Sequence, residues 1–200
     1  MTADKTTTGL TLATKITLVR LMGVPVFVLL LVYYNIGLAH GEEHTTERLM
    51  ALVVFILVAG TDALDGYLAR ARNEITNLGK VLDPLADKAL LLSGLILLTR
   101  PGLEPRIPIW FTTLVISRDV VLVGGYFLTH HFAGAVDVHP RWSGKIATVL
   151  QMGIILWVLS QFSSQWFYHV VAAAGVFTAI SFVQYVVDGS KQLAKASHKV

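Results

Sequence analysis

Six apolar stretches alternate with short polar segments along this chain. They cover about residues 18–36, 49–60, 85–98, 107–128, 146–162 and 167–187. Their residues do not alternate between apolar and polar, as the strands of a membrane barrel do. Because backbone groups in lipid must bond within their own segment, the pattern predicts an all-α integral membrane protein with six transmembrane helices. The second stretch runs on into a polar end, and the third reaches spanning length only if its helix begins near Asn77.

The composition supports this prediction and limits the domain organisation. Of the 200 residues, 54% are hydrophobic and 14% are charged, whereas soluble domains carry about 25% charged residues. Six spans fill the chain, so we expect a single membrane domain over residues 1–200. Residues 1–15 would form an interfacial or flexible segment and residues 189–200 a cytoplasmic tail. The absence of cysteine excludes disulfides and thiolate metal sites. A net charge of +3 is too small to indicate nucleic acid.

The basic residues lie mainly on one side of the predicted bundle. If the N-terminus is cytoplasmic, twelve of the 16 Lys and Arg residues fall on the cytoplasmic side, three fall on the other, and Arg118 lies within a span. This asymmetry predicts cytoplasmic N- and C-termini. The N-terminal residues lack an Arg-rich amphipathic presequence, which favours a bacterial cytoplasmic membrane over an organelle.

Four aspartates occur where the second and third predicted helices meet the cytoplasm. A carboxylate near bilayer depth costs roughly 2.5–3.5 kcal/mol, so four of them within a short segment need compensation. Helical spacing places one set of residues on one face of the second helix and another set on one face of the third. These sets are Asp62, Asp65, Gly66, Ala69 and Arg70, and then Gly79, Asp83 and Asp87.

Two such faces, joined by a short loop, can form a box of four carboxylates beside small residues. Oxygen-only ligands favour hard cations, so the box predicts two divalent ions, Mg²⁺ or Mn²⁺. A two-metal site suits phosphoryl transfer, and Arg70 offers a planar donor for a phosphate. Two other interpretations stay open: the aspartates could be solvated charges of an inactive scaffold, or they could serve an Asp-based membrane transporter.

The spacing D-x-x-D-G-x-x-A-R-x8-G-x3-D-x3-D, which these eight residues match, resembles the signature of the CDP-alcohol phosphotransferases. The resemblance extends to six spans and to Thr17, Arg20 and Pro25 in the first helix, although the family's usual Ile-Pro-Asn is absent. It implies metal-dependent transfer of a substituted phosphoryl group from a CDP-linked donor to an alcohol, with release of CMP. It also implies a homodimer.

Carried over by position, the resemblance assigns roles to individual residues. Asp62, Asp65, Asp83 and Asp87 would hold the two metals, and Asp87 would also be the general base, with Asp83 beside it in catalysis. The CDP donor would be bound by Thr61, Asp65, Gly66, Ala69, Arg70 and Gly79. The active site would then lie at the cytoplasmic face of the membrane.

The sequence around the site resembles the branch that uses CDP-diacylglycerol with glycerol-type acceptors. The segment Ser117-Arg118-Asp119 is similar to cardiolipin synthases, which use phosphatidylglycerol, and slightly favours that acceptor. Gly144-Lys145 is similar to the phosphatidylglycerophosphate synthases, which use glycerol 3-phosphate, but Ala147 replaces their usual second lysine. Since either acceptor carries an anionic phosphate, Arg118 and Lys145 are the candidate acceptor-phosphate ligands.

Overall fold

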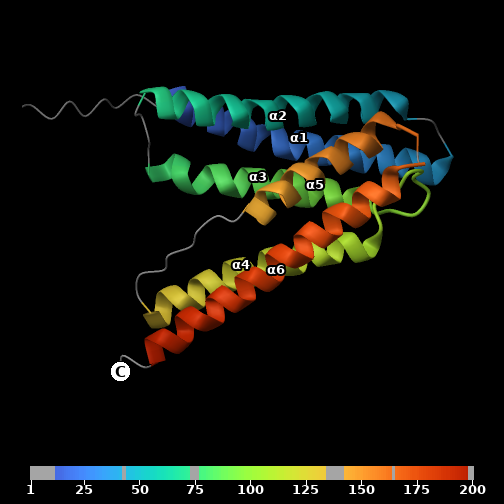
Figure 1. The fold of residues 1–200 in the computed structure, drawn as a ribbon. Coiled ribbons are helices and arrows are strands. Elements are labelled where there is room, and N and C mark those ends of the chain that lie inside the picture. The colour runs from blue at the N-terminus through green and yellow to red at the C-terminus, as the bar shows by residue number, and fades with distance from the viewer. Residues whose placement is uncertain (1–11, 42–43, 73–76, 134–141, 164, 198–200) are drawn as a thin grey trace, which may run out of the picture. The chain divides into compact units, whose positions relative to one another are not determined.

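The computed structural model describes the backbone of residues 12–41, 44–72, 77–133, 142–163 and 165–197, and side chains in residues 21–41, 44–61, 85–125, 142–163 and 165–191. Within these residues the chain forms six helices with short connections and no strand (Figure 1). The helices are α1 Leu12–His40, α2 Thr45–Arg72, α3 Asn77–Leu97, α4 Ile109–Ala133, α5 Trp142–Ser160 and α6 Phe167–Ser197. The predicted all-helical fold is confirmed.

Several helices are longer than the apolar stretches that predict them. Helix α3 begins at Asn77, in agreement with the start expected near that residue. Helix α5 begins at Trp142, four residues before its apolar stretch, and α6 continues ten residues beyond Val187 to Ser197. Hydropathy marks only the part of a helix that suits lipid, whereas backbone hydrogen bonding extends into the polar turns at either end.

The start of α2 is held by local polar contacts. The backbone N–H of Arg48 donates to the carbonyl oxygen of His44 at 3.3 Å, and His44 Nδ1 lies 3.1 Å from Glu47 Oε1. A backbone hydrogen bond and the His44 imidazole lower the pKa of Glu47. A carboxylate in the first turn also interacts favourably with the helix dipole. These contacts stabilise the first turn of α2.

The chain divides into two compact units, Met1–Gly94 and Leu95–Val200. In the first unit, α1 packs along α2. The rings of Phe27 and Phe55 are fully buried between these helices with centroids 5.4 Å apart. A Cβ built on Gly23 would lie 2.5 Å from Val58 Cγ2. The two helices therefore approach closely at Gly23, because that residue has no side chain.

In the second unit, α4 and α5 each pack along α6 (Figure 1). Its apolar core includes Phe111 on α4, Ile154 and Ile155 on α5, and Val171 and Ala174 on α6, all with at most 1% of their surface exposed. Polar side chains occur on the same inward faces, and these form the network described below. The second unit therefore places buried polar groups within an otherwise apolar three-helix packing.

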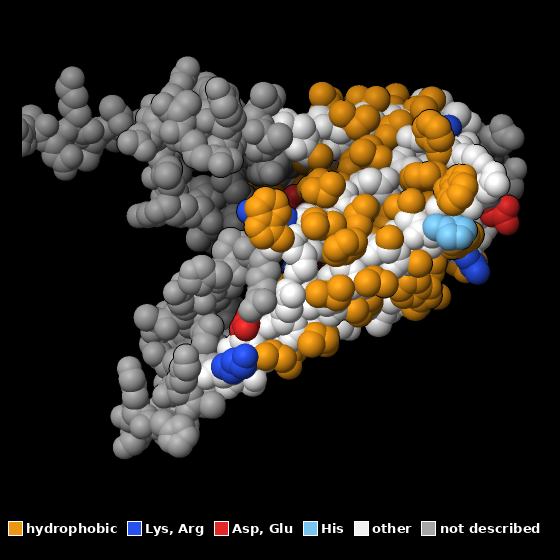
Figure 2. Space-filling model, viewed as in Figure 1, with side chains coloured by type: hydrophobic (Ala, Val, Ile, Leu, Met, Phe, Trp, Pro, Cys, Tyr) orange, Lys and Arg blue, Asp and Glu red, His pale blue; other side chains and the backbone are white. Residues whose placement is uncertain are grey.

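The helices carry apolar surface suited to lipid. Within the residues that the structure describes, three segments are long and apolar enough to cross a membrane: Leu21–His40, Trp142–Ser160 and Phe167–Lys191. Large hydrophobic side chains are exposed on several helices, including Met22, Leu57, Val149 and Val183. Figure 2 shows such side chains spread over the visible described surface, with few charged groups among them. A surface of this kind is typical of a membrane protein.

Candidate active site

The acidic segments predicted from the sequence lie on regular helices. Helix α2 continues without interruption through Asp62, Asp65 and Arg70 to Arg72, and α3 is helical through Asp83 and Asp87. Residues three and four apart on such helices share a face. The helical placement that the spacing argument requires is thus confirmed. The side chains of residues 62–84, a range that includes Gly66, Ala69 and Gly79, lie outside the described residues.

Two site residues at the edges of these segments have described side chains. Thr61 is partly exposed, and its Oγ1 donates to the carbonyl oxygen of Leu57 at 2.5 Å. Asp87 is half-buried on α3, where it follows the fully buried Ala86. One face of α3 is therefore packed at this level while the neighbouring carboxylate keeps access to solvent. A general base must come within hydrogen-bond reach of the substrate, which a partly exposed carboxylate can do.

One of the four predicted metal ligands, Asp87, has a described side chain. Among the residues whose side chains are described, no three His, Asp or Glu side chains gather as a metal site would require. Three of the four predicted ligands, Asp62, Asp65 and Asp83, are outside that set. The donor chemistry itself fits, because four carboxylates offer the oxygen ligands that Mg²⁺ and Mn²⁺ prefer. The four-carboxylate box stays a prediction.

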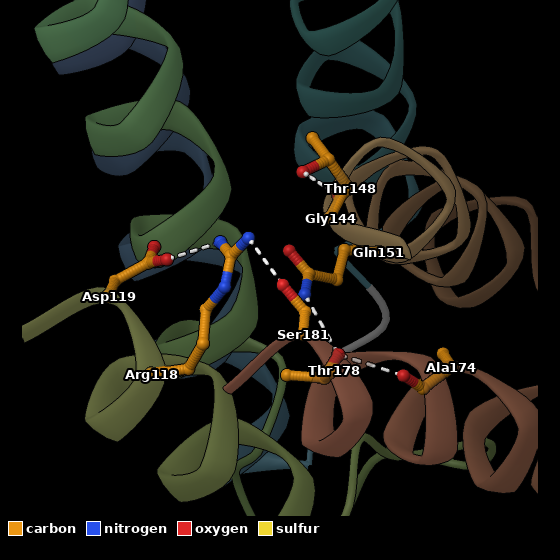
Figure 3. A network of polar contacts seen from close by, with 8 residues as sticks. All are labelled: Arg118, Asp119, Gly144, Thr148, Gln151, Ala174, Thr178 and Ser181. Atoms are coloured by element: carbon orange, nitrogen blue, oxygen red, sulfur yellow. Dashed lines mark hydrogen bonds and ion pairs between the residues drawn. The ribbon is translucent and has the colours of Figure 1, made fainter. Parts of the chain in front are cut away.

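The second unit contains a buried cation, Arg118 on α4. Only 4% of its surface is exposed. Its Nη1 donates to Asp119 Oδ1 at 2.7 Å, and its Nη2 donates to Ser181 Oγ on α6 at 3.1 Å (Figure 3). The guanidinium carbon lies 5.4 Å from the ring centre of Tyr185. Arg118 thus links α4 to α6, two helices that are far apart in sequence.

These contacts use only part of the hydrogen-bonding capacity of the guanidinium. Its five N–H groups can all donate, and the two hydrogen bonds above use two of them. Nε is buried and has no hydrogen-bond partner among the described residues. A buried donor without a partner costs about 1–3 kcal/mol, more when it is charged. An anionic group that accepts from Nε would remove that cost, so the geometry of Arg118 is compatible with its predicted role as a phosphate ligand.

Lys145, the other candidate for the acceptor phosphate, has a different environment. It is exposed in the first turn of α5, directly after the buried Gly144. Its Nζ lies 5.5 Å from the ring centre of Trp142, one turn earlier. Ser143 Oγ beside it donates to Gln184 Oε1 on α6 at 2.7 Å. Lys145 is therefore an exposed charge near the start of α5, whereas Arg118 is buried and hydrogen-bonded.

Sequence reasoning did not identify the polar residues that surround Arg118. Gln151 on α5 is buried, and its Nε2 donates to Thr178 Oγ1 on α6 at 3.3 Å (Figure 3). The Thr178 hydroxyl donates in turn to the carbonyl oxygen of Ala174 at 2.8 Å. Thr178, Ser181 and Tyr185 follow at i, i+3 and i+7, which is one face of a helix. That spacing within an apolar stretch was the available signal.

A buried cation and a buried amide inside apolar helices are typical of membrane proteins that handle ions or anionic substrates. Comparison with known proteins defines the class further. The family model for CDP-alcohol phosphatidyltransferase matches residues 10–183. The chain therefore belongs to the CDP-alcohol phosphatidyltransferase family, as the signature on α2 and α3 indicates, and it is a membrane transferase of phospholipid biosynthesis.

Individual relatives cover most of the chain. A CDP-diacylglycerol–glycerol-3-phosphate 3-phosphatidyltransferase of Bacillus subtilis is 40% identical over 70% of this chain and 72% of its own length. A probable phosphatidylglycerophosphate synthase of Mycobacterium tuberculosis is 35% identical over 88% of this chain and 79% of its own. A CDP-diacylglycerol–glycerol-3-phosphate 3-phosphatidyltransferase of Escherichia coli K12 is 31% identical over 86% of this chain and 91% of its own.

Proposed function

We propose that this protein transfers the phosphatidyl group of CDP-diacylglycerol to glycerol 3-phosphate and releases CMP. The observation that carries the proposal is the agreement among relatives. Those from Bacillus subtilis and Escherichia coli are named for this reaction, and that from Mycobacterium tuberculosis is a probable synthase of its product. The family indicates the reaction class, and the names of the relatives favour glycerol 3-phosphate as the acceptor.

This acceptor replaces the slight preference for phosphatidylglycerol that Ser117-Arg118-Asp119 suggested. The relatives favour the alternative, glycerol 3-phosphate, over cardiolipin synthesis. The side-chain contacts explain why the preference was weak. The Asp119 carboxylate accepts a hydrogen bond from Arg118 at 2.7 Å and so helps to hold the arginine in place. A carboxylate that holds a neighbouring arginine does not indicate which acceptor's phosphate that arginine binds.

In the proposed reaction the chain's own residues bind, orient and accept a proton. Asp87 takes the proton of an acceptor hydroxyl, whose oxygen then attacks the phosphatidyl phosphorus. The new oxygen–phosphorus bond replaces the bond to the bridging oxygen, and CMP leaves with that oxygen. Thr61, Asp65, Gly66, Ala69, Arg70 and Gly79 are the proposed residues of the donor site. Arg118 and Lys145 hold the phosphate of the acceptor.

Asp62, Asp65, Asp83 and Asp87 are the proposed ligands of two divalent cations. Such ions, when bound, stabilise the charge that develops on the attacking and leaving oxygens. We also propose that residues 1–200 form one membrane domain with six spans, cytoplasmic termini and an active site at the cytoplasmic face of a bacterial inner membrane. The asymmetric distribution of basic residues supports this topology. The family resemblance supports a homodimer.

The proposal is tested by CMP release from the purified full-length protein with CDP-diacylglycerol and Mg²⁺ or Mn²⁺. Parallel reactions contain either glycerol 3-phosphate or phosphatidylglycerol as the only acceptor. We expect CMP release with glycerol 3-phosphate and no release above background with phosphatidylglycerol. Release with phosphatidylglycerol alone would restore the cardiolipin interpretation. Release with neither acceptor would overturn both acceptor assignments and would indicate that the enzyme uses a different alcohol.

A further inference from the structure

The missing side chain of Gly144 lets the guanidinium of Arg118 approach α5. A Cβ built on Gly144 would lie 2.9 Å from Arg118 Nη2, 3.3 Å from Ser181 Oγ and 3.6 Å from the hydroxyl oxygen of Tyr185. The first distance is shorter than van der Waals contact permits. Any side chain at Gly144 would therefore push the guanidinium away from the position it occupies in Figure 3.

The surroundings of Gly144 differ from those of two other closely packed glycines. A Cβ on Gly23 would meet Val58, and one on Gly175 would meet Trp110 at 2.9 Å, so those glycines bring apolar surfaces together. At Gly144 all three nearest atoms are polar, and they belong to α4 and α6. Apolar packing does not require such an arrangement. The space beside Gly144 admits a buried charge and the two groups that hold it.

Ser181 and Tyr185 complete the support of Arg118 from α6. The Ser181 hydroxyl accepts from Nη2, the Tyr185 ring lies under the guanidinium, and Asp119 accepts from Nη1. These contacts fix the plane of the guanidinium and leave buried Nε without a partner among the described residues. A planar donor held in one orientation binds a phosphate with less loss of side-chain freedom than a mobile one.

We propose that Gly144, together with Ser181 and Tyr185, sets the position of Arg118 for binding the phosphate of the acceptor. These are positioning residues, since they act through Arg118. The inference rests on the proposed function, in which Arg118 binds that phosphate. It predicts that Gly144 controls the affinity for the acceptor and leaves the affinity for the CDP-linked donor unchanged.

The test is Gly144→Ala, with Gly153→Ala as the matched control. Both substitutions add one methyl group. Because both glycines lie on α5, both should raise helix propensity by a similar amount. A Cβ on Gly153 would meet nothing within 4 Å. Loss of one hydrogen bond to a charged group corresponds to about tenfold or more in binding. We expect Gly144→Ala to raise KM for glycerol 3-phosphate by about that factor, while KM for CDP-diacylglycerol stays unchanged. Gly153→Ala should change neither.

Two further variants separate positioning from a loss of folding. Ser181→Ala only removes an atom, so it keeps the packing and should also raise KM for glycerol 3-phosphate. In an Arg118→Lys background the ammonium ends short of the Nη2 position. Gly144→Ala should then have no additional effect on KM, which a double-mutant cycle measures as coupling between the two sites.

Three results would overturn the proposal. The first is an unchanged acceptor KM in both Gly144→Ala and Ser181→Ala. The second is an equal rise in the KM values of donor and acceptor, which would indicate general damage to the fold. The third is an effect of Gly144→Ala that persists undiminished with Arg118→Lys. Failure of the proposed function itself would be visible earlier, as no CMP release by the unaltered protein with glycerol 3-phosphate.

Discussion

The hydrogen bond between Gln151 and Thr178 predicts an asymmetric response to substitution. Gln151 is 1% exposed and Thr178 is fully buried, so neither contacts solvent or lipid. Gln151 Nε2 donates to Thr178 Oγ1 at 3.3 Å, while the Thr178 hydroxyl donates to the carbonyl oxygen of Ala174. Gln151 Oε1 has no partner among the described residues. The Gln151 amide thus relies on Thr178 for its hydrogen bond. Thr178 keeps its own hydrogen bond to the carbonyl oxygen of Ala174 even when Gln151 is replaced.

Thr178→Val removes the hydrogen-bond partner that the Gln151 amide has among the described residues, and it changes the side-chain shape little. Interhelical hydrogen bonds in membrane proteins contribute about 0.6 kcal/mol on average and about 1.7 kcal/mol at most. A buried polar group left without a partner costs about 1–3 kcal/mol. We therefore expect Thr178→Val to lower the free energy of unfolding by about 2 kcal/mol. Gln151→Leu removes the buried amide altogether and should be close to neutral. The double variant should resemble Gln151→Leu.

The assay is reversible unfolding of the purified protein in mixed detergent micelles, followed by circular dichroism. Thr148→Val is the matched control, because the Thr148 hydroxyl bonds within α5 to the carbonyl oxygen of Gly144 at 3.1 Å. That variant should lose less than 1 kcal/mol. Equal destabilisation by Gln151→Leu and Thr178→Val would refute the reasoning, since it would show that the amide contributes stability in its own right.

Two further predictions concern catalysis and helix packing. Asp87→Asn should lower turnover by about 10²- to 10⁴-fold, because an amide cannot accept the acceptor's proton, while equilibrium binding of CDP-diacylglycerol is retained. The control is Glu104→Gln, which also replaces a carboxylate with an amide but lies in the exposed connection before α4, and it should leave turnover unchanged. Wild-type turnover in Asp87→Asn would show that Asp87 is not the general base. Gly23→Ala, whose Cβ would overlap Val58, should cost about 1–3 kcal/mol of unfolding free energy. Adding Val58→Ala should recover part of it, and no recovery would place the strain elsewhere.

Much of the helical framework could be predicted from the sequence alone. The apolar stretches located the six helices that the structure describes, and the length argument predicted a start of α3 near Asn77. The spacing of the aspartates predicted shared faces because a helix has a fixed period, and α2 and α3 are indeed helical there. The same spacing identified the family. These are local properties, which neighbouring residues in the chain determine.

The environment of Arg118 was decided by tertiary structure. Its partner Ser181 lies 63 residues away, and no local pattern couples the two. The sequence offered Gly144 only as part of a Gly-Lys pair, whereas packing shows that its missing Cβ admits a guanidinium. The hydrogen bond between Gln151 and Thr178 likewise depends on the packing of α5 against α6, which the sequence pattern did not reveal. Contacts between helices depend on which faces pack together, and hydropathy does not distinguish a face toward lipid from a face toward another helix.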